Sequence, residues 1–236
     1  MISILAFIHC IDLVAVGFNA DTIAIASLIL NEPRDIVIYE PAGIQKTDSV
    51  RIVYLLDGEY SNYRYEKLSR EHFDKPVIGI GIINTNRNRD MLPVKEPDNF
   101  LEFIEKELIP AVEKHYLIEE RIIFGHSFAG GFTIYAMIKR PGLFDRYIAS
   151  SPTPIMKMVD AAGYLQLDNQ LNENIEFFFS YGSKDMKQVK KWCAILKSNL
   201  QMLKFANLHW KNKVTEGENH NTNDVITLIT GLHEFY

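Results

Sequence analysis

Short apolar runs alternate along the chain with breakers rich in glycine, proline and acidic residues. Most of these runs are continuously apolar rather than alternating, which is typical of strands buried on both faces of a parallel sheet. The predicted strands span residues 36–39, 51–56, 77–83, 121–124, 147–149, 175–181 and 209–214.

Apolar residues at helical spacing lie between several of these runs. Asp98 or Asn99 can cap a helix whose Leu101, Ile104, Leu108 and Val112 share one face. Further helices are predicted over 132–138, 187–203 and 225–235. Strands that alternate with helices in this way predict an α/β fold, with a mostly parallel central sheet and helices on both faces. Ligands of such sheets bind at the carboxyl ends of the strands.

A length of 236 residues fits one large α/β domain, which we expect over residues 21–236. Residues 1–20 are apolar and too short to span a membrane, so they are either a signal peptide or an N-terminal extension, such as an additional strand. Asp12 and the absence of Lys or Arg before Arg34 argue against a signal peptide. The compartment is periplasmic or extracellular if this segment is a signal peptide, and cytoplasmic otherwise.

Charge and composition restrict the partners. The net charge is −5 and no dense basic cluster occurs, so a nucleic-acid partner is not expected. Cysteines and histidines do not cluster at metal-ligand spacing, so no metal or other cofactor is implied. The two cysteines, Cys10 and Cys193, do not favour a disulfide. The oligomeric state is left open, and residues 153–173 are expected to form a cap or loop over the site.

The most informative segment is Gly125-x-Ser127-x-Ala129, which follows the apolar run 121–124 and precedes a helical pattern over 132–138. A strand, a sharp turn with serine at its tip and a helix form the nucleophile elbow of serine hydrolases. Small residues flank the serine because the strand and helix backbones approach closely there. Ala129 stands where glycine is usual. The pattern predicts Ser127 as a nucleophile.

A serine hydroxyl needs a neighbouring base, and in this fold the acid and then the histidine follow the serine in the chain. His220 lies in a loop after a late strand, whereas His126 adjoins the serine and is expected to point away from its hydroxyl. Asp185 follows the strand 175–181 and is the candidate acid, although it also fits as a helix cap. Glu216 and Glu218 are alternative acids, and a Ser–His pair without an acid is a further option.

An oxyanion needs backbone N–H donors. We expect one from Phe128, the residue after the nucleophile. The other is expected from the turn after strand 51–56, where Glu59 is the first choice and Gly58 the alternative.

Several segments together resemble the putative esterase family, which includes esterase D (S-formylglutathione hydrolase), enterochelin-esterase-like hydrolases and mycolyltransferases. They are YLLDG at 54–58, GHSFAGG at 125–131, YGSKD at 181–185 and ENH at 218–220. The segments 84–90, 100–116 and 140–152 are similar to the siderophore-esterase-like branch. The resemblance covers roughly residues 21–236. It implies an α/β-hydrolase fold and carboxylic-ester chemistry, with Ser127, His220, Phe128 and Glu59 in the roles given above. Asp185 carries over less well as the acid, because some members of the family work without a well-placed one.

The residues that would select the substrate are less defined. Members of the siderophore-esterase-like branch often carry a tryptophan-bearing stretch where this chain has Thr153-Pro154-Ile155-Met156. Arg87 and Arg89 could hold an anionic substrate, although each could instead pair with a neighbouring carboxylate. Tyr60 and Tyr63 could line the pocket, or could instead serve in aromatic packing.

The sequence therefore predicts a serine carboxylesterase that acts on a small-molecule ester through a Ser-His-Asp triad and an acyl-enzyme intermediate. Two alternatives remain open at this point: an acyltransferase on the same scaffold, and a hydrolase-like binding module without catalysis.

Overall fold

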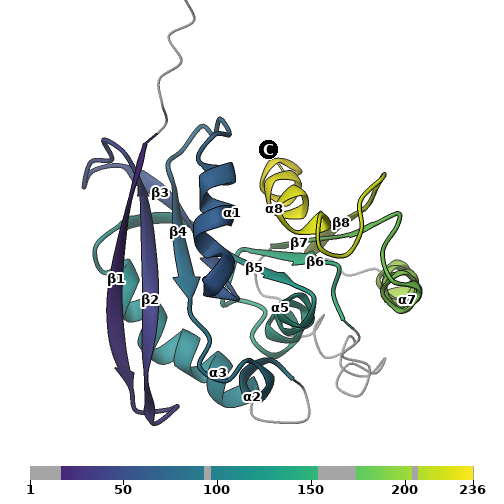
Figure 1. The fold of residues 1–236 in the computed structure, drawn as a ribbon, viewed down its shortest axis with the longest axis horizontal. Helices are drawn as coiled ribbons and strands as arrows, with labels where there is room; N and C mark the ends of the chain where they lie inside the picture. The colour runs from purple at the N-terminus through teal and green to yellow at the C-terminus, as the bar shows by residue number, and fades with distance from the viewer. Residues whose placement is uncertain (1–16, 93–96, 154–173, 204–206, 236) are drawn as a thin grey trace, which may run out of the picture.

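The computed structural model describes residues 17–92, 97–153, 174–203 and 207–235. Within these ranges the strands form one eight-stranded sheet in the order β1-β2-β4-β3-β5-β6-β7-β8 (Figure 1). Strands β3 to β8 are parallel to one another, whereas β1 and β2 form an antiparallel pair at one edge, and β2 runs antiparallel to β4. The strands are β1 Phe18–Ser27, β2 Glu32–Pro41, β3 Ser49–Leu55, β4 Val77–Ile82, β5 Leu117–His126, β6 Arg146–Ser150, β7 Ile175–Gly182 and β8 Leu208–Thr215.

Helices cover both faces of the sheet (Figure 1). Alternate residues of each buried strand face opposite sides. Val53 and Leu55 belong to an apolar cluster that includes side chains of α1 and α8, whereas Ile52 and Tyr54 belong to one that includes side chains of α3, α4, α5 and α7. This arrangement confirms the predicted sheet with helices on both faces. The helices are α1 Ser61–Leu68, α2 Arg87–Met91, α3 Pro97–Phe103, α4 Ile109–Glu113, α5 Phe128–Lys139, α7 Lys187–Leu203 and α8 Asn223–His233. None of the helices within the described ranges has the length and apolar character needed to cross a bilayer.

The helix predicted after Asp98 is present and begins at Pro97, but its middle turn is not α-helical. Between α3 and α4 the chain makes a π-helical turn over Ile104–Leu108. Pro110, at the start of α4, has no N–H to donate and its ring would crowd the carbonyl of Lys106 in a regular helix. A wider turn directly before the proline relieves both problems.

Strand β1 begins at Phe18, so the boundary expected between residues 20 and 21 falls inside a strand. The Phe18 ring packs against Tyr39 and Tyr65, with ring centroids 6.0 and 5.1 Å apart, which ties this strand to the domain. The predictions for residues 1–16 and for a cap over 154–173 lie outside the described residues.

Candidate active site

Ser127 lies at the turn between β5 and α5, with φ 60° and ψ −116°. Positive φ is unfavourable for a residue with a side chain, so the surrounding contacts must hold it. The Ser127 N–H donates to the carbonyl of Ser150 at 2.9 Å, and the Ser127 carbonyl accepts from the Gly131 N–H at 3.0 Å. A Cβ on Gly125 would lie 2.2 Å from the carbonyl oxygen of Ala129, so only glycine allows the strand and the helix to approach this closely.

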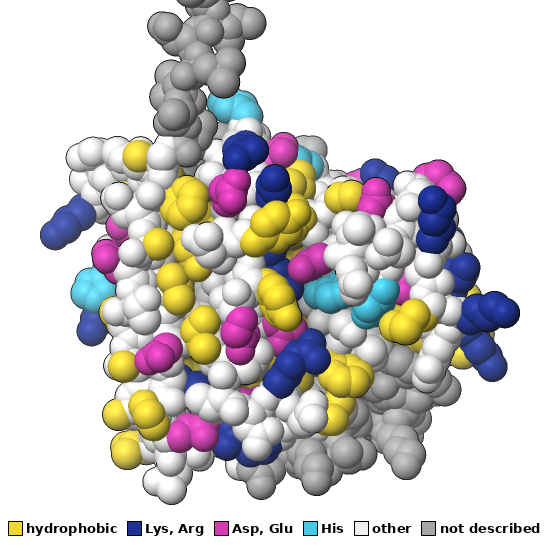
Figure 2. All heavy atoms as spheres, viewed as in Figure 1, with side chains coloured by type: hydrophobic (Ala, Val, Ile, Leu, Met, Phe, Trp, Pro, Cys, Tyr) yellow, Lys and Arg dark blue, Asp and Glu magenta, His cyan; other side chains and the backbone are white. Residues whose placement is uncertain are grey.

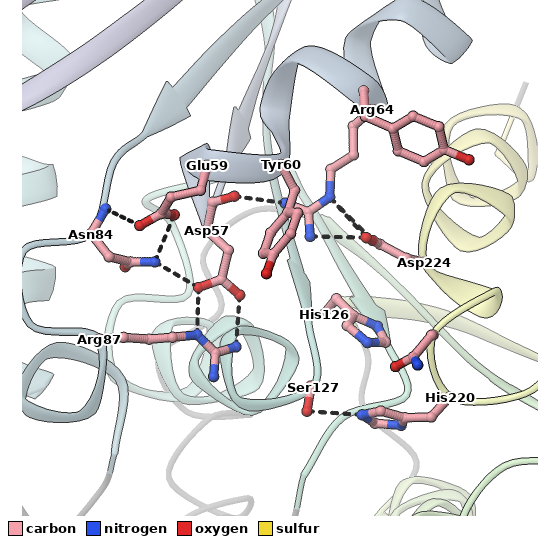
Figure 3. Close-up of a pocket in the computed structure, with 12 residues that line it drawn as sticks. Asp57, Glu59, Tyr60, Arg64, Asn84, Arg87, His126, Ser127, His220 and Asp224 are labelled. Carbon is pink, nitrogen blue, oxygen red and sulfur yellow. Dashed lines mark hydrogen bonds and ion pairs between the residues drawn. The ribbon is translucent and has the colours of Figure 1, made fainter.

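The loops after β7 and β8 bring Asp185 and His220 to the same edge of the sheet as Ser127. His220 Nε2 lies 3.0 Å from Ser127 Oγ, and His220 Nδ1 lies 2.9 Å from Asp185 Oδ1. Figure 3 shows the first of these contacts, with the imidazole and the hydroxyl pointing toward each other. The three side chains therefore form a continuous hydrogen-bonded chain, although they come from three separate loops.

Direct contact between the two loops supports this chain. The Lys184 N–H donates to the carbonyl of Glu218 at 2.8 Å, which links the turn carrying Asp185 to the turn carrying His220. A Cβ on Gly182 would lie 2.2 Å from that same carbonyl oxygen, so the close approach requires a glycine at the end of β7.

The Asp185 carboxylate is buried and fully hydrogen-bonded. Oδ1 accepts from His220 and from the Met186 N–H at 2.7 Å, and Oδ2 accepts from Ser151 Oγ at 2.5 Å. Burial alone would raise the pKa of Asp185, but the hydrogen bonds from His220, Ser151 and the Met186 N–H outweigh it and hold the pKa below its ordinary value. The contact with Met186 lies just before α7, so the helix-cap and triad interpretations of Asp185 are compatible.

A cluster of buried hydroxyls lies beneath the acid. Asn223, the first residue of α8, places its Nδ2 3.1 Å from Ser151 Oγ, 3.3 Å from Ser150 Oγ and 3.1 Å from Ser180 Oγ. Thr227, one turn further along α8, joins the same group through Ser150 and Ser180. The cluster connects α8 to Asp185 through Ser151.

His126 points away from the nucleophile, as expected. Its Nδ1 lies 3.1 Å from Ser150 Oγ, and its ring packs on the ring of His220 with centroids 4.8 Å apart. Burial lowers the pKa of His126 to about 4, so the ring is neutral near pH 7 and adds no charge beside His220.

The turn after β3 contains Gly58 and Glu59, the residues from which one oxyanion donor is expected. Asp57 has φ 54°, and the following residues Gly58–Tyr60 form one 3₁₀ turn whose first hydrogen bond runs from the Tyr60 N–H to the Asp57 carbonyl. The N–H groups of Gly58 and Glu59 precede that bond, and Phe128 is the first residue of α5. Groups in these positions have no acceptor within their own helix, which makes them suitable donors to an oxyanion.

A cavity of about 770 Å³ opens in front of Ser127 and His220. Figure 2 shows this face, where histidine side chains lie next to basic, acidic and apolar ones. Of the residues expected to contact substrate or oxyanion, Glu59, Tyr60, Tyr63 and Arg87 line the cavity. The lining is Asp57, Glu59, Tyr60, Tyr63, Arg64, Asn84, Arg87, His126, Ser127, His220, Asn221 and Asp224.

The arginines of the cavity are paired with carboxylates. Arg87 donates to both carboxylate oxygens of Asp57, at 2.6 and 2.7 Å, and Arg64 binds Asp224 at 3.0 to 3.2 Å (Figure 3). The hydrogen bond to Asp57 raises the pKa of Arg87, which keeps it charged. The cavity therefore does not present an excess of positive charge.

Arg89, expected as a second substrate-binding arginine, lies outside the cavity lining. Its guanidinium donates to both oxygens of Glu32, at 3.0 and 2.7 Å, and to Asp90 at 2.7 Å. These contacts hold it at the edge formed by β2 and α2.

A comparison with models of protein families identifies the family of this chain. The model described as Putative esterase matches residues 27–236. The chain belongs to this esterase family. The match of this model confirms the family that the sequence motifs indicated.

This esterase is also similar to individual proteins. It is 32% identical over 93 residues to the ferri-bacillibactin esterase BesA of Bacillus subtilis, covering 36% of this chain and 32% of that protein. It is 41% identical over 59 residues to a siderophore triacetylfusarinine C esterase of Aspergillus fumigatus, covering 24% and 20%. The matches thus span about a third and a fifth of these two relatives. An IroE-like serine hydrolase from Shewanella oneidensis superposes with a TM-score of 0.82 and 23% identity, over 92% of this chain and 80% of that one. This likeness confirms the predicted α/β-hydrolase fold.

Several site residues of this esterase carried no signal that the sequence patterns could detect. Arg64 and Asp224 line the cavity, and Asn223 contacts Ser151, which donates to Asp185. Only the pair Ser150-Ser151 had a usable signal, since two polar residues at the carboxyl end of a buried strand are placed for function in a parallel sheet.

Proposed function

We propose that this protein is a serine esterase in which Ser127 is the nucleophile, His220 the general base and Asp185 the acid that orients His220. The observation that carries the proposal is the continuous chain from Ser127 Oγ through both nitrogens of His220 to Asp185 Oδ1, with contacts of 3.0 and 2.9 Å. Such a chain can transfer the serine proton to His220 while Asp185 stabilises the resulting imidazolium.

The reaction would proceed in two halves. His220 Nε2 accepts the Ser127 proton as Oγ attacks the ester carbonyl, and the negative charge on the carbonyl oxygen is stabilised by the N–H groups of Phe128 and Glu59. His220 then gives the proton to the departing alcohol, which leaves an acyl group on Ser127. A water molecule, deprotonated by His220, attacks that acyl group and releases the carboxylic acid.

We further propose a siderophore ester as the natural substrate. Support comes from the activities for which the two relatives are named, a ferri-bacillibactin esterase and a triacetylfusarinine C esterase. A cavity of about 770 Å³ can admit a ligand larger than a simple short-chain ester. Tyr60 and Tyr63, exposed by 62% and 56% at its rim, offer aromatic surface for contact, and Arg87 offers its remaining donors.

The nucleophile is tested with Ser127→Ala and with Ser49→Ala as the matched control. Ser49 begins β3, at the opposite end of the strand from the site, and its hydroxyl contacts only Glu119 among the described residues. We expect Ser127→Ala to abolish hydrolysis of p-nitrophenyl acetate and labelling by a fluorophosphonate probe, and Ser49→Ala to retain both. Hydrolysis at the wild-type rate by Ser127→Ala would refute the proposal.

The substrate class is tested by comparing kcat/KM for ferri-bacillibactin, triacetylfusarinine C and p-nitrophenyl acetate. A siderophore esterase should prefer at least one of the siderophores by tenfold or more. A preference for the simple ester would leave the esterase proposal intact and reject the siderophore.

A further inference from the structure

Hydrogen bonds from Ser61 to the Gly58 carbonyl hold the peptide group between Gly58 and Glu59. The Gly58 carbonyl accepts two hydrogen bonds from Ser61, one from its N–H and one from its hydroxyl, the latter at 2.5 Å. Peptide bonds are planar, and no cis bond occurs among the described residues, so the Glu59 N–H points opposite to the Gly58 carbonyl. The orientation of this N–H is therefore fixed by the contacts that Ser61 makes with the carbonyl.

The opposite direction is the direction of the cavity. Ser61 is fully buried, whereas Asp57, Glu59 and Tyr60 of the same turn line the cavity. A carbonyl directed at Ser61 thus turns the neighbouring N–H toward the space in front of Ser127.

Tyr39 on β2 extends this support into the sheet. Its hydroxyl lies 2.8 Å from Ser61 Oγ. Ser61 has a single hydroxyl proton, which it donates to Gly58, so Tyr39 must be the donor to Ser61. The Tyr39 ring is buried and stacks on Tyr65 with centroids 5.0 Å apart, so its hydroxyl has little freedom to move. Burial raises the pKa of Tyr39, which keeps this donor protonated.

Strand β4 leaves a space for the Ser61 side chain. A Cβ on Gly81 would lie 2.3 Å from Ser61 Oγ and 2.7 Å from Ser61 Cβ. Any side chain at this position would push the hydroxyl away from the Gly58 carbonyl. The glycine in the middle of a buried strand is explained by this close approach.

We propose that Ser61, held in place by Tyr39, is a positioning residue that aims the Glu59 N–H at the oxyanion. This inference rests on the proposed function, since it takes Glu59 as an oxyanion donor. Ser61 touches neither substrate nor reacting atoms and acts through the peptide that follows Gly58.

The test is Ser61→Ala, with Ser69→Ala as the matched control. Ser69 lies just after the same helix, and its hydroxyl makes the same kind of contact with the carbonyl three residues earlier, Glu66, at 3.0 Å. For p-nitrophenyl acetate we expect Ser61→Ala to lower kcat about tenfold with KM within twofold, because an oxyanion contact is made only in the transition state. The loss should stay below the 10²–10³ that follows removal of a donor, because the Ser61 N–H still holds the carbonyl. Ser69→Ala should match the wild type.

Tyr39→Phe separates positioning from general stability and also serves if Ser61→Ala does not fold. We expect it to lower kcat severalfold in the wild-type background and to add nothing in the Ser61→Ala background, since Tyr39 acts through Ser61. Wild-type kcat in Ser61→Ala, a parallel rise of KM, or an equal effect of Tyr39→Phe in both backgrounds would overturn the inference. In that case the wild type would still be active and Ser127→Ala still inactive, so the proposed function would stand. Failure of the proposed function gives a different result, either an inactive wild type or an active Ser127→Ala. That result would refute both the proposed function and the inference about Ser61.

Discussion

Replacing Asp185 by asparagine keeps the shape of the buried acid and removes its charge. The contacts decide how the new amide turns. Oδ1 accepts from the Met186 N–H and from His220, so an NH₂ group at that position would face two donors. We therefore expect the amide oxygen to take the Oδ1 position and the NH₂ group to face Ser151.

In this orientation His220 keeps its Nδ1–H bonded to an oxygen and its Nε2 available to Ser127. What is lost is the charge opposite the imidazolium. Hydrogen bonds to charged groups contribute about 1.5–3 kcal/mol and neutral ones about 0.5–1.5, a difference of roughly 1–1.5 kcal/mol. Because about 1.4 kcal/mol corresponds to tenfold in rate, Asp185→Asn should lose about tenfold in kcat/KM. Asp185→Ala removes the whole contact, up to about 3 kcal/mol, and should lose about a hundredfold.

Both variants would be compared on p-nitrophenyl acetate, with Asp145→Asn as the control. Asp145 is another carboxylate bonded to a backbone N–H, that of Arg121 at 2.7 Å, but it lies away from the cavity and its variant should be fully active. Equal and severe losses in Asp185→Asn and Asp185→Ala would show that the amide turns the other way and that our orientation argument is wrong. An Asp185→Ala variant that retains a third or more of the activity would favour a Ser–His pair without an acid.

Two other properties of the site lead to further predictions. Gly182→Ala should lower kcat at least tenfold because its Cβ would displace the Glu218 carbonyl and with it the loop of His220, while Gly142→Ala, with nothing within 4 Å, should have no effect; equal activities would contradict the steric argument. His126 has a pKa of about 4 in the folded protein against an ordinary 6.5, so the unfolded chain binds the extra proton between these values. The free energy of unfolding in urea should therefore be highest above about pH 6.5 and decrease as the pH falls toward 4, and His126→Gln should reduce this decrease. The same decrease with pH in His126→Gln and the wild type would count against a buried, neutral His126 ring.

The sequence predicted the buried part of the fold better than its edge. Strands β4 and β7 are buried on both faces and appear as continuous apolar runs, so their positions could be predicted. Strand β1 lies at the edge with most of its residues partly or fully exposed, and its pattern gives no comparable signal. The helix after Asp98 was predicted from spacing alone, and the effect of Pro110 within it was not considered.

The site shows a similar division. Elbow, base and acid follow from chain order and from the rule that ligands bind at the carboxyl ends of strands, and the structure brings Ser127, His220 and Asp185 into one hydrogen-bonded chain. The pairing of Arg87 with Asp57 depends on two segments that meet only in the folded chain. Arg87 and Arg89 both lie on α2, two positions apart, and residues at that spacing point in different directions. Recognition of that short helix would have shown that only one of the two could face the cavity.

The position of Asn223 at the start of α8 has a consequence for the order in which activity can arise. Ser127 is placed by β5, by α5 and by its bond to Ser150 on β6, whereas Ser151, which donates to the acid, is held by an amide on α8. A molecule in which this last helix has detached would keep its nucleophile and lose the support of its proton acceptor. Catalytic activity should therefore be among the first properties lost during partial unfolding and among the last gained during folding.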